Sequence, residues 1–198
     1  MNVLSELRKM LAFIDQNVDG INTDNSERHI AAGTLFETAS CHAKGVSILL
    51  EEHLYASASA LQRILFESFI RASWLLHCAS DTEVNLFLTK DKIQPYFGDL
   101  VSAVEEALNW PDTLSNVKSN IWNALNSYTH GGYMQVTRHY DGSSIMPNHT
   151  HEEIEEMGKF SAMMAFLTFC QIIGMSNNRE KDKAVEELYE QVGWCINT

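Results

Sequence analysis

The chain has 198 residues, of which 45% are hydrophobic and 20% charged, so it is long enough to bury one hydrophobic core. With only three prolines and ten glycines it has no room for a long disordered linker, and we expect a single helical domain over residues 1–198. The net charge of −12 argues against the broad basic surface that extended DNA or RNA binding requires, but a small site for one nucleotide is not excluded.

Apolar residues recur at three- and four-residue spacing along most of the chain, and this spacing predicts helices. The third predicted helix is apolar on most of its sides and should therefore lie at the centre of the fold. The predicted helices cover about 3–20, about 26–54 and about 56–78, a short segment from 81, a segment from Pro95 that ends before Pro111, a segment from an Asp112 cap to about Tyr128, then 150–175 and about 178–194. The sequence thus predicts an all-α bundle of about six to eight helices.

Residues 131–149 interrupt the helical pattern. Polar and apolar residues alternate from Tyr133 to Tyr140 and are followed by Asp141-Gly142, a dipeptide typical of tight turns. We expect a small hairpin or an extended loop there, and so long a stretch without helix is often functional. Thr150 and Glu153 then form the pattern of a capping box, which predicts the start of the next helix.

The cysteines are isolated from one another, and none forms a Cys-x-x-Cys pair, so we expect them to be reduced and buried. No secretory signal is visible in residues 1–9. The longest apolar run, 161–175, is shorter than about 18 residues and contains Gln171, which favours a core helix over a membrane span. We therefore expect a cytoplasmic protein without a membrane segment. The four cysteines are Cys41, Cys78, Cys170 and Cys195.

Arg63, Glu67 and Arg71 follow one another at four-residue spacing and so form a row on one face of the central predicted helix. In one interpretation Glu67 pairs with both arginines in a packed triad, or the row is the solvated edge of the helix. In the other, the row borders a polar hollow in which the arginines bind a phosphate, because a guanidinium binds oxyanions through two N–H groups.

His130 ends the next candidate segment, in which it precedes Gly131-Gly132. A glycine commonly ends a helix in the left-handed conformation, and a histidine there interacts favourably with the helix dipole, so no chemistry is required. Alternatively, His130 beside a loop is a general acid or base, and Asn126 one turn earlier orients the substrate. The residues alone leave both interpretations open.

Two of these segments resemble divergent HEPN domains, which are helical bundles common in bacterial toxins and phage-defence proteins. The likeness lies in Ala-Leu-Gln-Arg63-Ile-Leu-Phe-Glu67 on a long helix and in Asn-Ser-Tyr-Thr-His130-Gly at the end of a later one, over about residues 56–132. Similar uncharacterised bacterial families share both features. The resemblance implies a metal-independent ribonuclease that acts as a homodimer, with His130 as the catalytic histidine.

The HEPN signature is an arginine, then four to six intervening residues, then the histidine, but here positions 123–125, which have that spacing from His130, are Asn, Ala and Leu. The positive charge that stabilises the reacting phosphate would therefore come from Arg63, Arg71 or Arg138. Arg71 and His77 have the signature spacing by themselves, but in the middle of an apolar helix, where chance explains it better.

Two histidine-containing segments complete the candidates. His149-Thr-His151-Glu152-Glu153 could ligate a metal, but no second cluster completes a site, so a polar helix start is the simpler interpretation and we expect no cofactor. Arg138-His139-Tyr140 combines a cation with aromatic rings and could contact a base or a phosphate. Tyr128 joins Arg138 and His139 as a candidate binding residue.

Three hypotheses follow from the sequence. The first is a HEPN-like bacterial stress or phage-defence protein, dimeric, that cleaves RNA around His130. The second is a non-catalytic module of the same fold, which binds a partner protein or a small anionic ligand in the hollow at Arg63, Glu67 and Arg71. The third is a purely structural helical scaffold.

Overall fold

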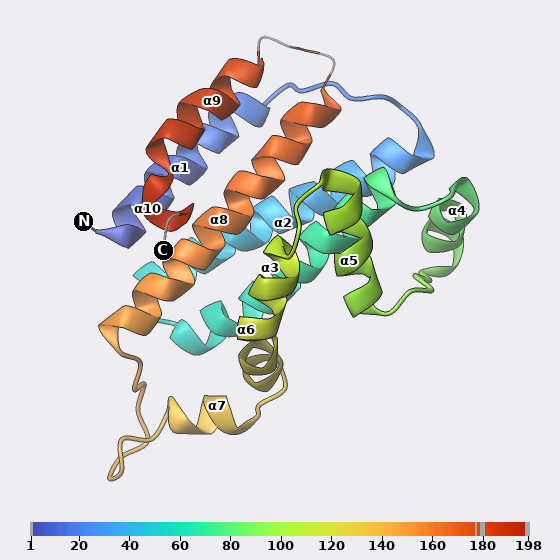
Figure 1. The fold of residues 1–198 in the computed structure, drawn as a ribbon. Helices are drawn as coiled ribbons and strands as arrows, with labels where there is room; N and C mark the ends of the chain where they lie inside the picture. Colours follow the sequence, from blue (N-terminus) through green and yellow to red (C-terminus); the bar gives the residue numbers. More distant parts are fainter. Residues whose placement is uncertain (1, 177, 179–180, 197–198) are drawn as a thin grey trace.

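The computed structural model describes residues 2–176, 178 and 181–196 (Figure 1). That part of the chain forms ten helices and no strand, which confirms the predicted all-α bundle. The helices are α1 (Val3–Val18), α2 (Glu27–Glu51), α3 (Tyr55–His77), α4 (Asp81–Lys90), α5 (Phe97–Leu108), α6 (Thr113–Thr129), α7 (Tyr133–Thr137), α8 (His151–Met175), α9 (Asp182–Gln191) and α10 (Gly193–Ile196).

Helix α3 lies at the centre of the bundle, as its composition predicts. It packs against α2, α5, α6 and α8, and this is why it can be apolar on most of its sides. Its buried side chains are large as well as numerous, so they fix how the neighbouring helices are spaced. Leu65, Phe66, Phe69, Ile70 and Leu75 of α3 are fully buried.

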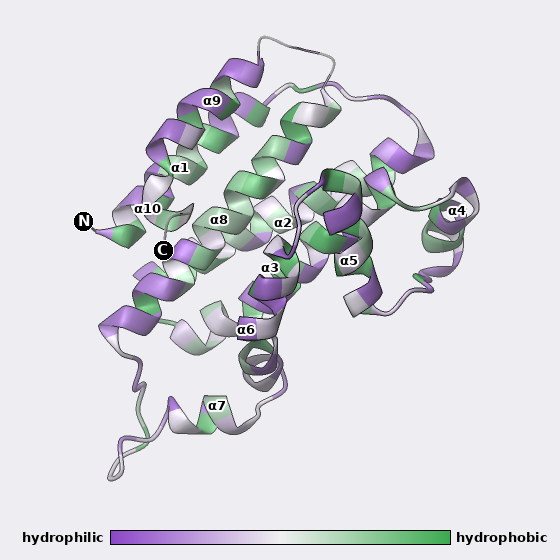
Figure 2. Ribbon diagram, viewed as in Figure 1, coloured by the Kyte–Doolittle hydropathy of each residue, from purple (hydrophilic) through white to green (hydrophobic). Residues whose placement is uncertain are grey.

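Helix α8 is the other long core helix, and Figure 2 shows it mostly hydrophobic along its middle, whereas α9 is mostly hydrophilic. By length and composition α8 meets the requirements of a membrane span, and it is the one helix of the described residues that does so. However, 61% of its apolar stretch is buried inside the bundle. A core helix of a folded domain meets the same requirements, so this is weak evidence for a membrane span.

Several helix starts follow their predicted caps. The Ser26 hydroxyl caps α2, and the capping box at Thr150 and Glu153 starts α8. Asp112 precedes α6 as expected, but its side chain does not cap the helix, and its φ of 58° is left-handed. The carboxylate of Glu105, from α5, accepts the Ser115 backbone N–H at 2.7 Å instead.

The predicted extended structure at 133–140 is wrong, because residues 133–137 form α7. The Ser127 hydroxyl accepts the Met134 backbone N–H at 2.9 Å, and this contact with the end of α6 helps to start a helix that the alternating pattern does not indicate. The expected turn at Asp141-Gly142 is closed by a single bridge between Tyr140 and Ile145. Figure 1 shows α7 and the loop after it projecting from the bundle.

Smaller differences concern helix ends and the burial of the cysteines. Helix α2 ends at Glu51 rather than near 54, because His53 adopts a left-handed φ of 59°. The last helix, predicted to start at about residue 178, begins at Asp182 as α9, and residues 179 and 180 between these two positions lie outside the described residues. Cys195 is buried as expected, but Cys41 is exposed on an outward face of α2, and Cys78 and Cys170 are half-buried; burial still raises the pKa of Cys170 to about 12.

Candidate functional site

Arg63 and His130, 67 residues apart in sequence, meet where the end of α6 packs against α3. An N–H of the Arg63 guanidinium donates a hydrogen bond to Nε2 of His130. Because a guanidinium keeps its protons, Nε2 is the acceptor and the imidazole carries its proton on Nδ1. Thr129 lies at this crossing, where its hydroxyl donates to the Leu125 carbonyl of its own helix at 2.8 Å and lies 3.4 Å from the Ala60 carbonyl of α3. The packing of α6 on α3 thus places an arginine beside the histidine.

Glu67 connects the two arginines of α3. The Arg63 Nε donates to one carboxylate oxygen of Glu67 at 2.8 Å, and the Arg71 Nη2 lies 3.5 Å from the other. The side chains of Arg63 and Glu67 are 20% and 21% exposed and that of Arg71 is 43% exposed, so the row is neither dry packing nor a fully solvated edge. The carboxylate therefore orients both guanidinium groups at a partly open surface.

Trp122 completes this group, and the sequence analysis did not identify it. The Arg63 guanidinium carbon lies 5.2 Å from the centre of the Trp122 ring, a distance typical of cation–π contacts. Trp122 in turn stacks on Phe97 of α5, with ring centres 4.5 Å apart and planes within 12°. The signal was the four-residue spacing of Trp122, Asn126 and His130, which places all three on one face of α6.

We call Arg63, Glu67, Arg71, Trp122 and His130 the Arg63–His130 cluster. It contains an open donor position, because Nε of Arg71 is buried yet has no hydrogen-bond partner among the described residues. Asn126 is half-buried on the same face of α6, and its backbone carbonyl accepts the His130 N–H at 3.0 Å. Two arginines against one glutamate leave the cluster one net positive charge, a suitable setting for an anion.

The other predicted binding residues lie apart from the Arg63–His130 cluster. Arg138 forms an ion pair with Glu153 of α8, and His139 contacts the Gln135 carbonyl at 2.8 Å through Nδ1. Tyr128 is two residues before His130, so it points to nearly the opposite side of α6. The structure therefore does not bring Arg138 or His139 to the catalytic candidate.

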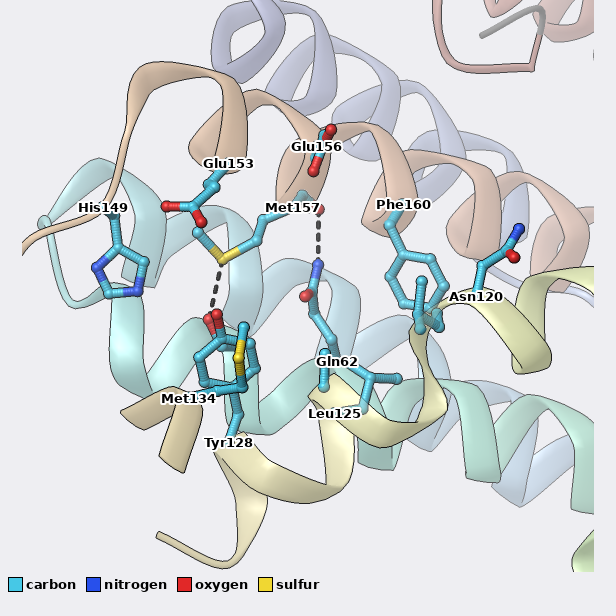
Figure 3. Close-up of a pocket in the computed structure, with 13 residues that line it drawn as sticks. Gln62, Asn120, Leu125, Tyr128, Met134, His149, Glu153, Glu156, Met157 and Phe160 are labelled. Carbon is cyan, nitrogen blue, oxygen red and sulfur yellow. Dashed lines mark hydrogen bonds between the residues drawn. The ribbon is translucent and has the colours of Figure 1, made fainter. Parts of the chain in front are cut away.

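Tyr128 instead lines a cavity of about 270 Å³ between α3, α6, α7 and α8, which we call the α6–α8 cavity (Figure 3). Burial raises the pKa of the Tyr128 hydroxyl and lowers that of His149, which lies at one end of this space. Gln62 of α3 spans toward α8, where its Nε2 donates to the Met157 carbonyl at 2.9 Å (Figure 3). The sequence analysis did not identify this cavity.

The metal-ligand pattern at 149–153 does not form a cluster in the structure. His151 is exposed and lies 3.4 Å from Glu155, whereas the ring of His149 packs 5.2 Å from that of Tyr55. Within the described residues, no three His, Cys, Asp or Glu side chains are grouped so that they could hold a metal ion. Glu153 is engaged with Arg138 and with the start of α8.

Searches of curated proteins and of solved structures gave no match to this chain. A family model matches residues 36–198, which is most of the chain and includes all of the Arg63–His130 cluster and the α6–α8 cavity. The match agrees with the sequence-based expectation of an uncharacterised helical family. The chain belongs to DUF6988, a family of unknown function.

Proposed function

We propose that the Arg63–His130 cluster binds a phosphodiester of RNA and cleaves it without a metal ion, in the manner of a HEPN-like ribonuclease. The contact between Arg63 and His130 is the observation that carries this proposal. It supplies a guanidinium to a histidine whose own helix has none at 123–125. The likeness to HEPN domains itself rests on the sequence motifs alone.

Arg63 would hold the phosphate. Glu67 occupies its Nε, and the Trp122 ring lies against its face, so the Nη groups are the ones that remain for a ligand. A phosphate oxygen then takes the N–H that Arg63 gives to His130 in the free protein, and Arg71 adds a second cation. Such preorganised donors stabilise the charge that develops on phosphorus in the transition state.

His130 would transfer the proton. Once the phosphate engages Arg63, Nε2 of His130 is free to accept the proton of the ribose 2′-hydroxyl, whose oxygen attacks the adjacent phosphorus. The bond from phosphorus to the 5′-oxygen breaks, and the proton held on the imidazole passes to that oxygen. The products are a 2′,3′-cyclic phosphate and a 5′-hydroxyl, and neither oxidant nor metal is consumed.

Incubation of end-labelled RNA in EDTA tests the proposal. We expect the wild type to yield fragments with 2′,3′-cyclic phosphate ends, and His130→Ala and Arg63→Met each to cleave at least about 100-fold more slowly. Arg8→Met is the matched control, because Arg8 is an exposed arginine far from the cluster in sequence and should leave cleavage unchanged. Equal RNA integrity with wild type and His130→Ala would remove the ribonuclease.

A non-catalytic role for the same cluster is the second candidate. It is favoured by the state of Glu67, which already neutralises part of both guanidinium groups and so suits reversible binding of a small anion. In that case phosphate or a mononucleotide would raise the melting temperature of the wild type but not of Arg63→Met, and RNA would stay intact. With either chemistry, we propose a cytoplasmic homodimer with a role in stress or phage defence.

A further inference from the structure

The α6–α8 cavity is separate from the Arg63–His130 cluster. Its walls include Gln62, about 100° around α3 from Arg63, and Tyr128, which points to nearly the opposite side of α6 from His130. Its volume of about 270 Å³ is close to the lower end of ligand pockets, about 300–1,000 Å³. A single base or nucleoside fits such a space, whereas an extended chain does not.

The polar groups of the cavity have unused hydrogen-bonding capacity. Gln62 is 5% exposed, and its amide nitrogen is occupied by Met157, so its side-chain oxygen is the group left to accept. Both ring nitrogens of His149 are buried and have no partner in the part of the chain that the structure describes. Glu156 lines the cavity but is exposed to solvent, and its carboxylate has no ion pair or hydrogen bond with those residues.

The charge of the cavity selects against anions. Arg138 neutralises Glu153, and the low pKa of the buried His149 keeps that ring uncharged near neutral pH. The exposed carboxylate of Glu156 therefore leaves a net negative charge at the solvent-exposed edge of the cavity. A phosphate inside the cavity would be repelled, while an uncharged molecule that donates hydrogen bonds would be attracted.

The remaining walls are apolar and suit a flat molecule. Met157 and Phe160 of α8 lie across the cavity from Leu125 and Met134, while His149 and Asn120 stand near its two ends (Figure 3). A planar ring can contact sulfur and aromatic side chains on both faces and keep its edges for hydrogen bonds. Shape and charge together describe an uncharged heteroaromatic base with a donor edge.

We propose that the α6–α8 cavity binds guanine, as the base or as guanosine. Guanine carries two adjacent N–H donors, N1–H and the N2 amino group, which match the two oxygens of the unpaired Glu156 carboxylate. Its other edge carries the O6 and N7 acceptors, and the N–H of neutral His149 can donate to one of them. Adenine lacks both the N1–H and the 2-amino donors and presents an acceptor at N1, which a carboxylate repels.

This inference does not depend on RNA cleavage. Titration calorimetry of the full chain in EDTA tests it, with guanosine as the proposed ligand and with adenosine and the aromatic amine tyramine as the comparison ligands. We expect guanosine to bind at least about 10-fold more tightly than adenosine, because adenosine lacks both donors that guanine offers to the Glu156 carboxylate. Glu156→Gln should weaken guanosine binding at least about 10-fold for the same reason. Ala124→Phe, which fills the cavity wall, should abolish binding.

Two control variants define the site. Glu187→Gln changes an exposed carboxylate on α9, and Arg63→Met disables the Arg63–His130 cluster, so both should bind guanosine as the wild type does. The proposal is overturned if guanosine does not saturate the protein at millimolar concentration, if adenosine or tyramine binds as tightly, or if Arg63→Met loses binding. It is also overturned if Glu156→Gln binds normally, and this variant decides the matter should Ala124→Phe fail to fold.

Discussion

At the scale of single residues, the geometry of the Arg63–His130 cluster depends on Glu67. One carboxylate oxygen holds Arg63 at 2.8 Å and the other faces Arg71 at 3.5 Å, so each guanidinium is oriented by the same group. Glu67 does not contact His130 in this arrangement. Its contribution is to position Arg63 against the imidazole rather than to react.

Glu67→Gln therefore separates positioning from folding. The amide keeps the shape but places an NH2 group or a neutral oxygen against Arg63, so we expect a loss of about 1–2 kcal/mol in the free energy of unfolding, since the pair is partly solvated. RNA cleavage should fall about 10-fold or more. Urea unfolding and the cleavage assay measure both effects, with Glu190→Gln on α9 as the control. Unchanged cleavage in a folded Glu67→Gln protein would contradict the role of Glu67.

His149 makes stability depend on pH. Burial lowers its pKa from 6.5 in the fold, so between the folded and unfolded pKa values the unfolded chain binds more protons. Its stabilising contribution is therefore complete above about pH 6.5 and is lost as the pH falls through the folded pKa. Urea unfolding at about pH 7.5 and pH 5.5 should show a larger loss for the wild type than for His149→Gln. His42, whose pKa burial also lowers, is present in both proteins, so equal losses would refute the prediction.

At the scale of elements, the junction between α6 and α7 depends on two adjacent glycines with different constraints. Gly131 has a φ of +64° and open space around it, so its requirement is conformational. Gly132 has ordinary backbone angles, but an added Cβ would lie 2.5 Å from the Ser127 hydroxyl oxygen. That hydroxyl accepts the Met134 N–H and so helps to start α7.

Gly132→Ala should consequently lower the free energy of unfolding more than Gly131→Asn does. For Gly132→Ala we expect a loss of about 1–3 kcal/mol, through overpacking and loss of the hydrogen bond to Met134. For Gly131→Asn we expect a loss of less than about 1 kcal/mol, because asparagine tolerates positive φ. Urea unfolding gives the two values, and amide exchange at Met134 should accelerate in Gly132→Ala alone. Equal costs for the two variants would show that the contact with Ser127 is unimportant.

At the scale of the whole molecule, the acidic charge of the chain limits how the proposed site could bind RNA. The net charge is −12, and the Arg63–His130 cluster offers two arginines, so about one or two phosphates should be neutralised. For single-stranded RNA this predicts a shallow salt dependence, with less than about a 10-fold loss of affinity between 50 and 200 mM salt. Fluorescence anisotropy with a short uncleavable RNA measures it, and a loss of 100-fold or more would indicate an extended basic surface instead.

The fold and the site differ in how far the sequence could predict them. Apolar periodicity suffices for the long helices, because each buries a continuous face. It fails for α7, whose start depends on a contact with Ser127 that no local pattern contains. The row at Arg63 and the histidine at the end of α6 follow from local spacing, but their meeting depends on where α6 crosses α3. The α6–α8 cavity arises from four elements and leaves no motif.

The pairing of Arg138 with Glu153 is a further case of this kind. From the sequence, Arg138 and Arg63 are equivalent candidates for the charge beside His130, because both are arginines of unknown surroundings. Packing separates them, since α8 brings a carboxylate to one and α6 brings an imidazole to the other. Which of them faces the histidine is therefore a property of the tertiary fold.

A double-mutant cycle on RNA cleavage tests most directly whether Arg63 and His130 act as one site. Rates in EDTA are compared for the wild type, Arg63→Met, His130→Ala and the double variant. Groups that act as a unit are strongly non-additive, so we predict that the double variant is about as slow as the slower single variant. Losses that multiply in the double variant, or four equal rates, would contradict the account.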